Sequence, residues 1–110
     1  MASDKDLVQY IADQCGGAGT ITTRLMFGDY ALYCNAKVVG LICDNRFFLK
    51  PTPEGRELLR TVALAPPYEG AKDYFRIDEI DDHGYLSALV GATCKALPEP
   101  RPKRKRKQYD

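Results

Sequence analysis

The 110-residue sequence has no tryptophan, a single histidine and no pair of cysteines in a C-x-x-C spacing. The usual zinc motifs combine cysteine and histidine at short fixed spacings, so these shortages argue against a metal site of that kind. Long apolar runs are also missing, since the longest, residues 38–43, is far short of the roughly 20 residues of a membrane helix. Three aspartates interrupt the first fourteen residues, which therefore do not resemble a signal peptide. We expect a cytoplasmic protein.

Glycine clusters of the phosphate-binding kind are absent as well. The stretch MFGDYALY, residues 26–33, has a lone Gly28 followed by Asp29 in an apolar, aromatic run. A phosphate loop needs several glycines between a strand and a helix, and usually a lysine after them. Here one glycine separates two strand-like segments, which favours a bend or a β-bulge. We expect no nucleotide or other cofactor.

Charge is distributed unevenly, although the net charge is only +1. Residues 99–110 hold six basic residues against two acidic ones, a net +4, whereas residues 1–98 hold ten basic and thirteen acidic residues, a net −3. An acidic body is a poor polyanion-binding surface, but a basic tail can bind phosphates without sequence preference. The same tail is also typical of a solubilising segment, and the two interpretations stay open.

Four cysteines occur, Cys15, Cys34, Cys43 and Cys94. The strand register given below sets Cys34 and Cys43 apart, so a disulfide between them is not favoured. We expect four free thiols, mostly buried, in a reducing compartment.

Apolar periodicity and capping signals predict one domain over residues 1–98 and a basic tail over residues 99–110. Helices are expected from a Ser3 cap to about Cys15, from a Thr52 cap to about Ala63 with Leu58, Leu59 and Val62 inward, and from an Asp81 or Asp82 cap to about Leu97. Strands are expected at 20–27, 30–34, 37–43, 46–50 and 74–80. This order predicts an α+β, two-layer fold, an antiparallel meander with helices.

Two-residue turns at Asn35-Ala36 and Asp44-Asn45 would set the register of the meander. One face would then carry Tyr30, Leu32, Val39, Leu41 and Phe48, and the other Ala31, Tyr33, Val38, Gly40, Ile42, Phe47 and Leu49. Both faces are apolar. Either a second copy of the chain covers the face that the helices leave, or the three helices divide between the two faces.

Catalytic or metal-binding chemistry has weak support in the sequence. His83 stands beside Asp81 and Asp82 at a predicted helix start, where an exposed histidine and capping acids are the ordinary interpretation. The acids Asp78, Glu79, Asp81 and Asp82 do not have the spacing of a calcium loop. We expect no catalytic residue and no metal ligand.

The order of elements and two segments resemble the N-terminal domain of the TfoX/Sxy family of bacterial competence regulators. The segments are TRLMFGDYALY, residues 23–33, and LICDNRFFLK, residues 41–50; Pro67-Tyr68 and the strand beginning at Tyr74 add to the likeness. The sequence departs from the family pattern at Asp29 and Ala31, where glycines are usual, and at the Asn35-Ala36 turn. The C-terminal helical domain of two-domain members is not expected here. The resemblance implies a fold like that of secretion chaperones, which are often dimers.

The resemblance also implies a regulatory domain that acts through partner proteins, and it suggests no enzymatic activity. If one sheet face is open, the candidate protein contacts are Tyr30, Tyr33 and Phe47. The alternative function is nucleic-acid binding through the tail, by Arg101, Lys103, Arg104, Lys105, Arg106 and Lys107.

Overall fold

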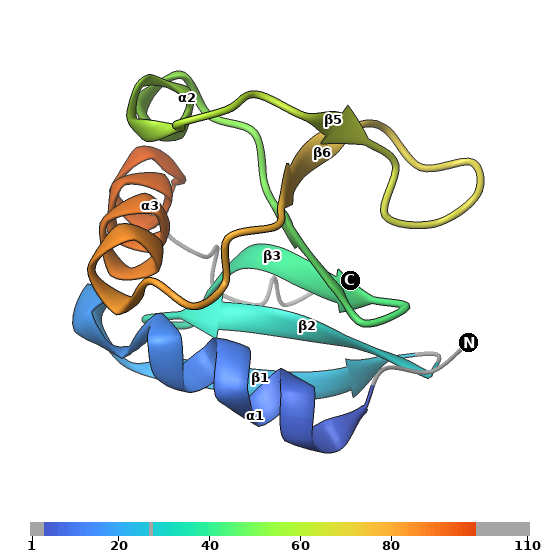
Figure 1. Cartoon of the computed structure of the whole chain (residues 1–110). Coiled ribbons are helices and arrows are strands. Elements are labelled where there is room, and N and C mark those ends of the chain that lie inside the picture. Colours follow the sequence, from blue (N-terminus) through green and yellow to red (C-terminus); the bar gives the residue numbers. More distant parts are fainter. Residues whose placement is uncertain (1–3, 27, 99–110) are drawn as a thin grey trace, which may run out of the picture.

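The computed structural model describes residues 4–26 and 28–98, and shows an antiparallel six-stranded sheet with helices packed on it (Figure 1). The helices are α1 (Lys5–Gln14), the 3-10 turn η1 (Gly16–Ala18), α2 (Pro53–Leu58) and α3 (His83–Ala96). The strands are β1 (Ile21–Met26), β2 (Asp29–Cys34), β3 (Lys37–Cys43), β4 (Arg46–Leu49), β5 (Leu64–Ala65) and β6 (Tyr74–Ile77), in the spatial order β1-β2-β3-β4-β6-β5. The α+β fold class predicted from the sequence is confirmed.

Side-chain caps explain where the helices begin. The Asp4 carboxylate accepts from the Asp6 amide at 2.9 Å and so caps α1. The predicted cap of this helix, Ser3, lies outside the described residues. The Thr52 hydroxyl accepts from the Gly55 amide at 3.0 Å at the start of α2, and Asp82 accepts from the Tyr85 amide at 3.1 Å at the start of α3.

Helix α2 is shorter than predicted, because it ends at Leu58 and not near Ala63. The chain leaves the helix after Leu58 and runs as a loop to Leu64–Ala65, which pair with β6 at the edge of the sheet. Consequently Leu58 and Val62, predicted to point inward, are 45% and 43% exposed. Strand β5 has only two residues, too few to leave a periodic pattern in the sequence.

A single hydrophobic core lies between the sheet and the helices. Alternate strand residues meet the apolar faces of α1 and α3 there, as expected for one side of an antiparallel sheet. The fully buried members of this core include Ile11, Cys15, Leu32, Cys34, Val39, Ile42, Phe47, Leu49, Leu86, Leu89 and Val90. The first and last helices and β6 contribute to this core Val8 and Ile11, then Leu86, Leu89, Val90 and Cys94, and Phe75 and Ile77. All four cysteines are free and buried, as predicted.

The predicted turns are confirmed, but a β-bulge changes the predicted faces. Cys34 faces Lys37 and Leu41 faces Phe48, as expected. Within the β2–β3 pairing the register shifts between Leu32 and Tyr33. Tyr33 faces Val38 and Leu32 faces Gly40, so Val39 is the extra residue of a β-bulge. A one-residue shift moves every following side chain to the opposite face. Tyr30 and Leu32 therefore share a face with Ile42, Phe47 and Leu49, and not with Leu41 and Phe48.

All of the described helices lie on one side of the sheet, because α1, α2 and α3 pack against the same core or against each other. In Figure 1, α1 and α3 lie side by side against the sheet and α2 continues the layer above α3. The alternative in which the helices divide between the two faces is therefore wrong for the described chain. None of the helices in residues 4–26 and 28–98 is long and apolar enough to cross a membrane.

Candidate functional site

The sheet face that points away from the helices, here called the second face, carries an apolar row between two arginines. The strand register aligns Arg24, Ala31, Leu41, Phe48 and Arg76 across five strands. Leu41 is half-buried and Phe48 is 5% exposed. In the described part of the chain no helix packs over this row, but Ala31 and Phe48 are buried, at 1% and 5% exposed, so Leu41 is the apolar member of the row that a partner can touch.

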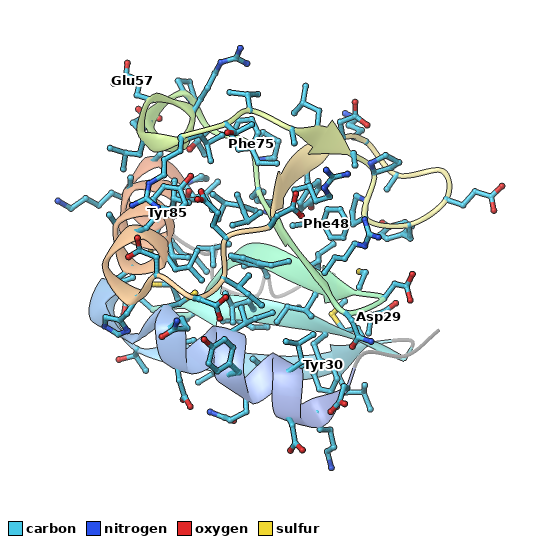
Figure 2. The ribbon with its side chains drawn as sticks, in the orientation of Figure 1. Asp29, Tyr30, Phe48, Glu57, Phe75 and Tyr85 are labelled. Atoms are coloured by element: carbon cyan, nitrogen blue, oxygen red, sulfur yellow. The ribbon has the colours of Figure 1, made fainter. Side chains whose placement is uncertain are left out.

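A hollow of about 480 Å³ lies at one end of the second face, where it meets the loop that joins β5 to β6. Its lining is mostly apolar and aromatic: Met26, Asp29, Tyr30, Leu41, Cys43, Tyr68 and Tyr74. Figure 2 shows Asp29 at the end of the sheet far from α3, with Phe48 on the same side of the molecule. The volume is within the range of small-ligand and side-chain pockets.

Two of the exposed apolar side chains of the protein border this hollow. Met26 is 41% exposed and Tyr68 is 61% exposed. Large apolar groups scattered singly need no explanation, but groups gathered at the rim of an apolar hollow mark a contact surface. This hollow is therefore the strongest candidate site in the described chain.

The Cys43 thiol and the Tyr74 hydroxyl in the hollow hold their protons more tightly than usual, and the Asp29 and Asp44 carboxylates lie near Cys43. Burial, with Asp29 and Asp44 nearby, raises the pKa of the Cys43 thiol from 9.0 to about 11. Burial, followed by the neighbouring Tyr68 and Cys43, also raises the pKa of Tyr74. Cys43 is thus a neutral thiol near neutral pH, and it lacks the lowered pKa of a nucleophilic cysteine.

The three predicted protein contacts have different surroundings. Tyr33 lies on the second face, half-buried, with the Arg24 guanidinium 6.0 Å from the centre of its ring. Tyr30 packs against the core and also lines the hollow. Phe47 is fully buried in the core, so no partner can touch it, and its assignment to an open face was wrong. The bulge is the reason, because it places Phe48 and not Phe47 on the second face.

The acidic cluster around His83 is used for structural contacts. The Tyr10 hydroxyl donates to Asp81 at 2.5 Å, which joins α1 to the segment before α3. Asp82 caps α3 and bonds Arg60 at 2.8 Å, and the Tyr85 amide, followed by the Arg60 guanidinium, lowers its pKa. His83 is exposed at the first position of α3.

Within residues 4–26 and 28–98 no group of three or more His, Cys, Asp or Glu side chains is placed to hold a metal ion. The predicted nucleic-acid contacts, Arg101 and residues 103–107, lie outside the described residues.

Sequence reasoning missed most of the hollow. Leu41 was predicted to face Tyr30 across the sheet but faces Ala31, and Tyr68 was noted only as part of the family likeness. Tyr74 was predicted as the first residue of a strand, and the structure confirms that position. The signal that could have found Tyr68 is its place beside Pro66-Pro67, since two prolines hold an aromatic side chain in a fixed direction.

Comparison with known proteins agrees with the resemblance noted from the sequence. Residues 13–96 match the TfoX N-terminal domain family. A protein of Spirochaeta aurantia, described as an uncharacterized 12.7 kDa protein in the trpE 5' region, is 41% identical over 105 residues, which cover 94% of this chain and 91% of that protein. A relative of nearly the same length indicates that the domain also occurs in a stand-alone form. The family match spans α3, the sheet and most of the core, and the chain therefore belongs to the TfoX N-terminal domain family.

Proposed function

We propose that this chain is a non-catalytic regulatory domain that works in the cytoplasm by binding proteins through its second face. Membership of the TfoX N-terminal domain family supports a competence-regulator-like role. The observation that carries the proposal is the half-buried Leu41 on the second face together with the exposed Met26 and Tyr68 at the hollow beside it, a region over which no helix of the described chain packs. Such a surface in a small α+β domain is typical of a protein contact.

The partner that we propose to test is a second copy of the chain. Apolar residues occupy the centre of the row, so two copies packed face to face would bring like surfaces together. Positive charge at one end of the row is already compensated, since Arg76 pairs with Asp78 at 3.2 Å. Charge repulsion on that side would therefore not oppose association.

Sedimentation equilibrium of the purified chain tests this proposal. We expect a dimer whose stability changes little with salt, because apolar contacts are insensitive to ionic screening. Leu41→Asp should convert the dimer to a monomer, and Tyr33→Asp, at another half-buried position of the same face, should weaken it. The matched control is Leu58→Asp, which places the same charge on an exposed leucine of α2 in the helix layer.

A wild-type chain that stays monomeric at every concentration would contradict self-association through this face. Equal weakening by the Leu41 and Leu58 variants would also count against it, because the effect would then not depend on the second face. Circular dichroism of each variant separates a lost contact from a lost fold.

A second candidate function rests on the charge of the tail, a net +4 over residues 99–110. This segment would bind nucleic acid through phosphates, with affinity that falls steeply as salt rises. Titration of a short mixed-sequence DNA duplex tests it, with full chains in which Lys103, Arg104, Lys105 and Arg106 are changed to Glu as the comparison. Binding that is equal in both chains, or that ignores salt, would eliminate the tail as a nucleic-acid site.

A further inference from the structure

We infer that the free edge of β1 pairs with β1 of a second copy of the chain, antiparallel, with Thr23 of one copy opposite Thr23 of the other. The six-stranded sheet would then continue from one copy into the next. This contact goes beyond the second-face contact proposed above and does not rest on it, because the edge and the face are different surfaces of the sheet.

β1 and β5 form the two edges of the sheet (Figure 1). β5 has only two residues, and a short edge strand is one way in which proteins prevent unwanted pairing. β1 has six residues, Ile21–Met26, and contains no proline, glycine or lysine. Its one charged residue is Arg24, whose guanidinium lies 6.0 Å from the centre of the Tyr33 ring, over β2 and not beside the edge. β1 therefore lacks the features that usually protect an edge strand.

The Leu25 end of this edge is uncovered. α1 begins near the β3–β4 turn, where the Asp4 amide donates to the side-chain oxygen of Asn45 at 2.7 Å. Leu25 lies opposite Tyr30 on the core side of the sheet, yet it is 61% exposed, so the helix does not cover this end of β1. A large apolar side chain exposed on a long edge strand marks a contact for a neighbouring strand.

Alternate residues of β1 direct their main-chain groups toward the edge. The Thr20 carbonyl accepts from the Asn35 amide at 2.9 Å, so Thr20 directs its main-chain groups toward β2. Because this direction alternates along a strand of an antiparallel pair, Ile21, Thr23 and Leu25 direct their N–H and C=O groups away from β2. Within residues 4–26 and 28–98, no main-chain hydrogen bond from another helix or loop reaches these groups. A further strand could bond them.

Pairing about a two-fold axis favours one register. With Thr23 opposite Thr23, Ile21 lies opposite Leu25, so the outward main-chain groups meet one another and the exposed leucine is covered. On the second face, Thr22 then lies opposite Arg24. An axis at Arg24 would set two arginines opposite each other, and like charges at opposed positions destabilise a strand pair. An axis at Thr22 would leave Leu25 beyond the end of the other strand.

Amide hydrogen exchange of the nitrogen-15-labelled full chain, followed by NMR, tests this pairing. One strand of each copy is a smaller contact than a standard interface of roughly 20–30 residues a side, so we expect it at high protein concentration. When the concentration is raised about 20-fold, exchange of the Ile21, Thr23 and Leu25 amides should slow by at least about threefold, by mass action. Exchange of the Thr22 and Arg24 amides, which are directed toward β2, should change less.

Two substitutions at Thr22 test the register. Thr22→Glu places a carboxylate opposite Arg24 of the second copy and should increase the protection, whereas Thr22→Arg places two arginines opposite each other and should abolish it. Thr22 is exposed, so neither change should alter the fold of the single chain. The matched controls are Leu64→Glu and Leu64→Arg, which place the same charges on an exposed leucine of β5 at the other edge and should leave the exchange as in the wild type.

Exchange that does not depend on protein concentration would overturn the inference, as would equal effects of the two Thr22 variants. Concentration-dependent protection that is lost at these amides in Leu41→Asp would also overturn it, because the contact would then belong to the second face. Protection that persists in Leu41→Asp supports edge pairing, whatever sedimentation shows for the second face. Either contact can therefore fail while the other holds.

Discussion

Gly40 lies where its main chain is in close contact with the neighbouring strand β4. A β-carbon added there would lie 2.5 Å from the Phe48 carbonyl oxygen and 3.0 Å from the Phe47 ring. The residue follows the bulge at Val39 and lies between β2 and β4. Both of its strand neighbours are fixed by pairing, so the backbone has little room to move away.

We therefore predict that Gly40→Ala lowers the free energy of unfolding by about 1–3 kcal/mol, the usual cost of overpacking. Urea denaturation measures it. Gly16→Ala is the control, because nothing lies within 4 Å of its added carbon, and it should change stability by no more than about 0.5 kcal/mol. A neutral Gly40→Ala would mean that the bulge relaxes at little cost.

The Cys15 thiol makes stability depend on alkaline pH. Cys15 is fully buried, and burial raises its pKa from 9.0 to about 12. Above pH 9 the unfolded chain loses this proton while the folded chain keeps it, so the stability contributed by the thiol is present below pH 9 and declines from pH 9 toward 12. Ionisation thus favours the unfolded state as pH rises.

We predict that the unfolding free energy of the wild type falls more steeply than that of Cys15→Ala between about pH 8 and about pH 10.5. Urea denaturation at several pH values gives the two slopes. Comparing slopes removes the constant cost of the substitution and the titration of tyrosines and lysines common to both chains. Parallel slopes would show that Cys15 ionises alike in both states.

Helix α2 depends on its cap, since it has six residues and is too short to be stable by itself. Thr52 is 7% exposed, and its hydroxyl accepts from the Gly55 amide at 3.0 Å. Gly55 in turn has no room for a β-carbon, which would lie 3.0 Å from the hydroxyl oxygens of Thr52 and Thr93. The cap therefore also anchors α2 against α3.

We predict that Thr52→Ala destabilises the protein by about 1 kcal/mol, as for other lost helix caps, and that Thr52→Ser restores most of the loss. Thermal or urea unfolding followed by circular dichroism measures both. If the serine variant were no better than alanine, the methyl group of Thr52 and not its hydroxyl would be the stabilising part.

Element boundaries show where sequence patterns suffice and where they fail. The turns at Asn35-Ala36 and Asp44-Asn45 were predictable because asparagine and aspartate tolerate the positive φ that three of the four turn residues, Asn35, Asp44 and Asn45, adopt. The bulge at Val39 could not be predicted, because an extra residue in an apolar strand does not interrupt the pattern of polar and apolar residues. That one residue reversed the roles of Phe47 and Phe48 and so changed the candidate site.

The whole molecule shares one core, and this predicts cooperative unfolding. Residues of α1, α3 and all central strands contact the same cluster, and β6 joins the meander through β4. Tyrosine fluorescence and circular dichroism should therefore report the same transition in urea. Leu49→Ala removes a fully buried side chain, so the free energy of unfolding obtained from either signal should fall by about 2–5 kcal/mol. Separate transitions would mean that the α1-β1-β2 part unfolds independently.

Sequence alone determined the three α-helices and all the described strands except β5, the capping residue of α2, the buried cysteines and the family resemblance. Each of these depends on local backbone chemistry or on residues near one another in the chain. Only the tertiary structure decided that all the described helices share one face, that Phe48 lies on the other, and that Met26, Asp29, Tyr68 and Tyr74 meet in one hollow. These depend on a one-residue register shift and on contacts between distant segments, which no local pattern encodes.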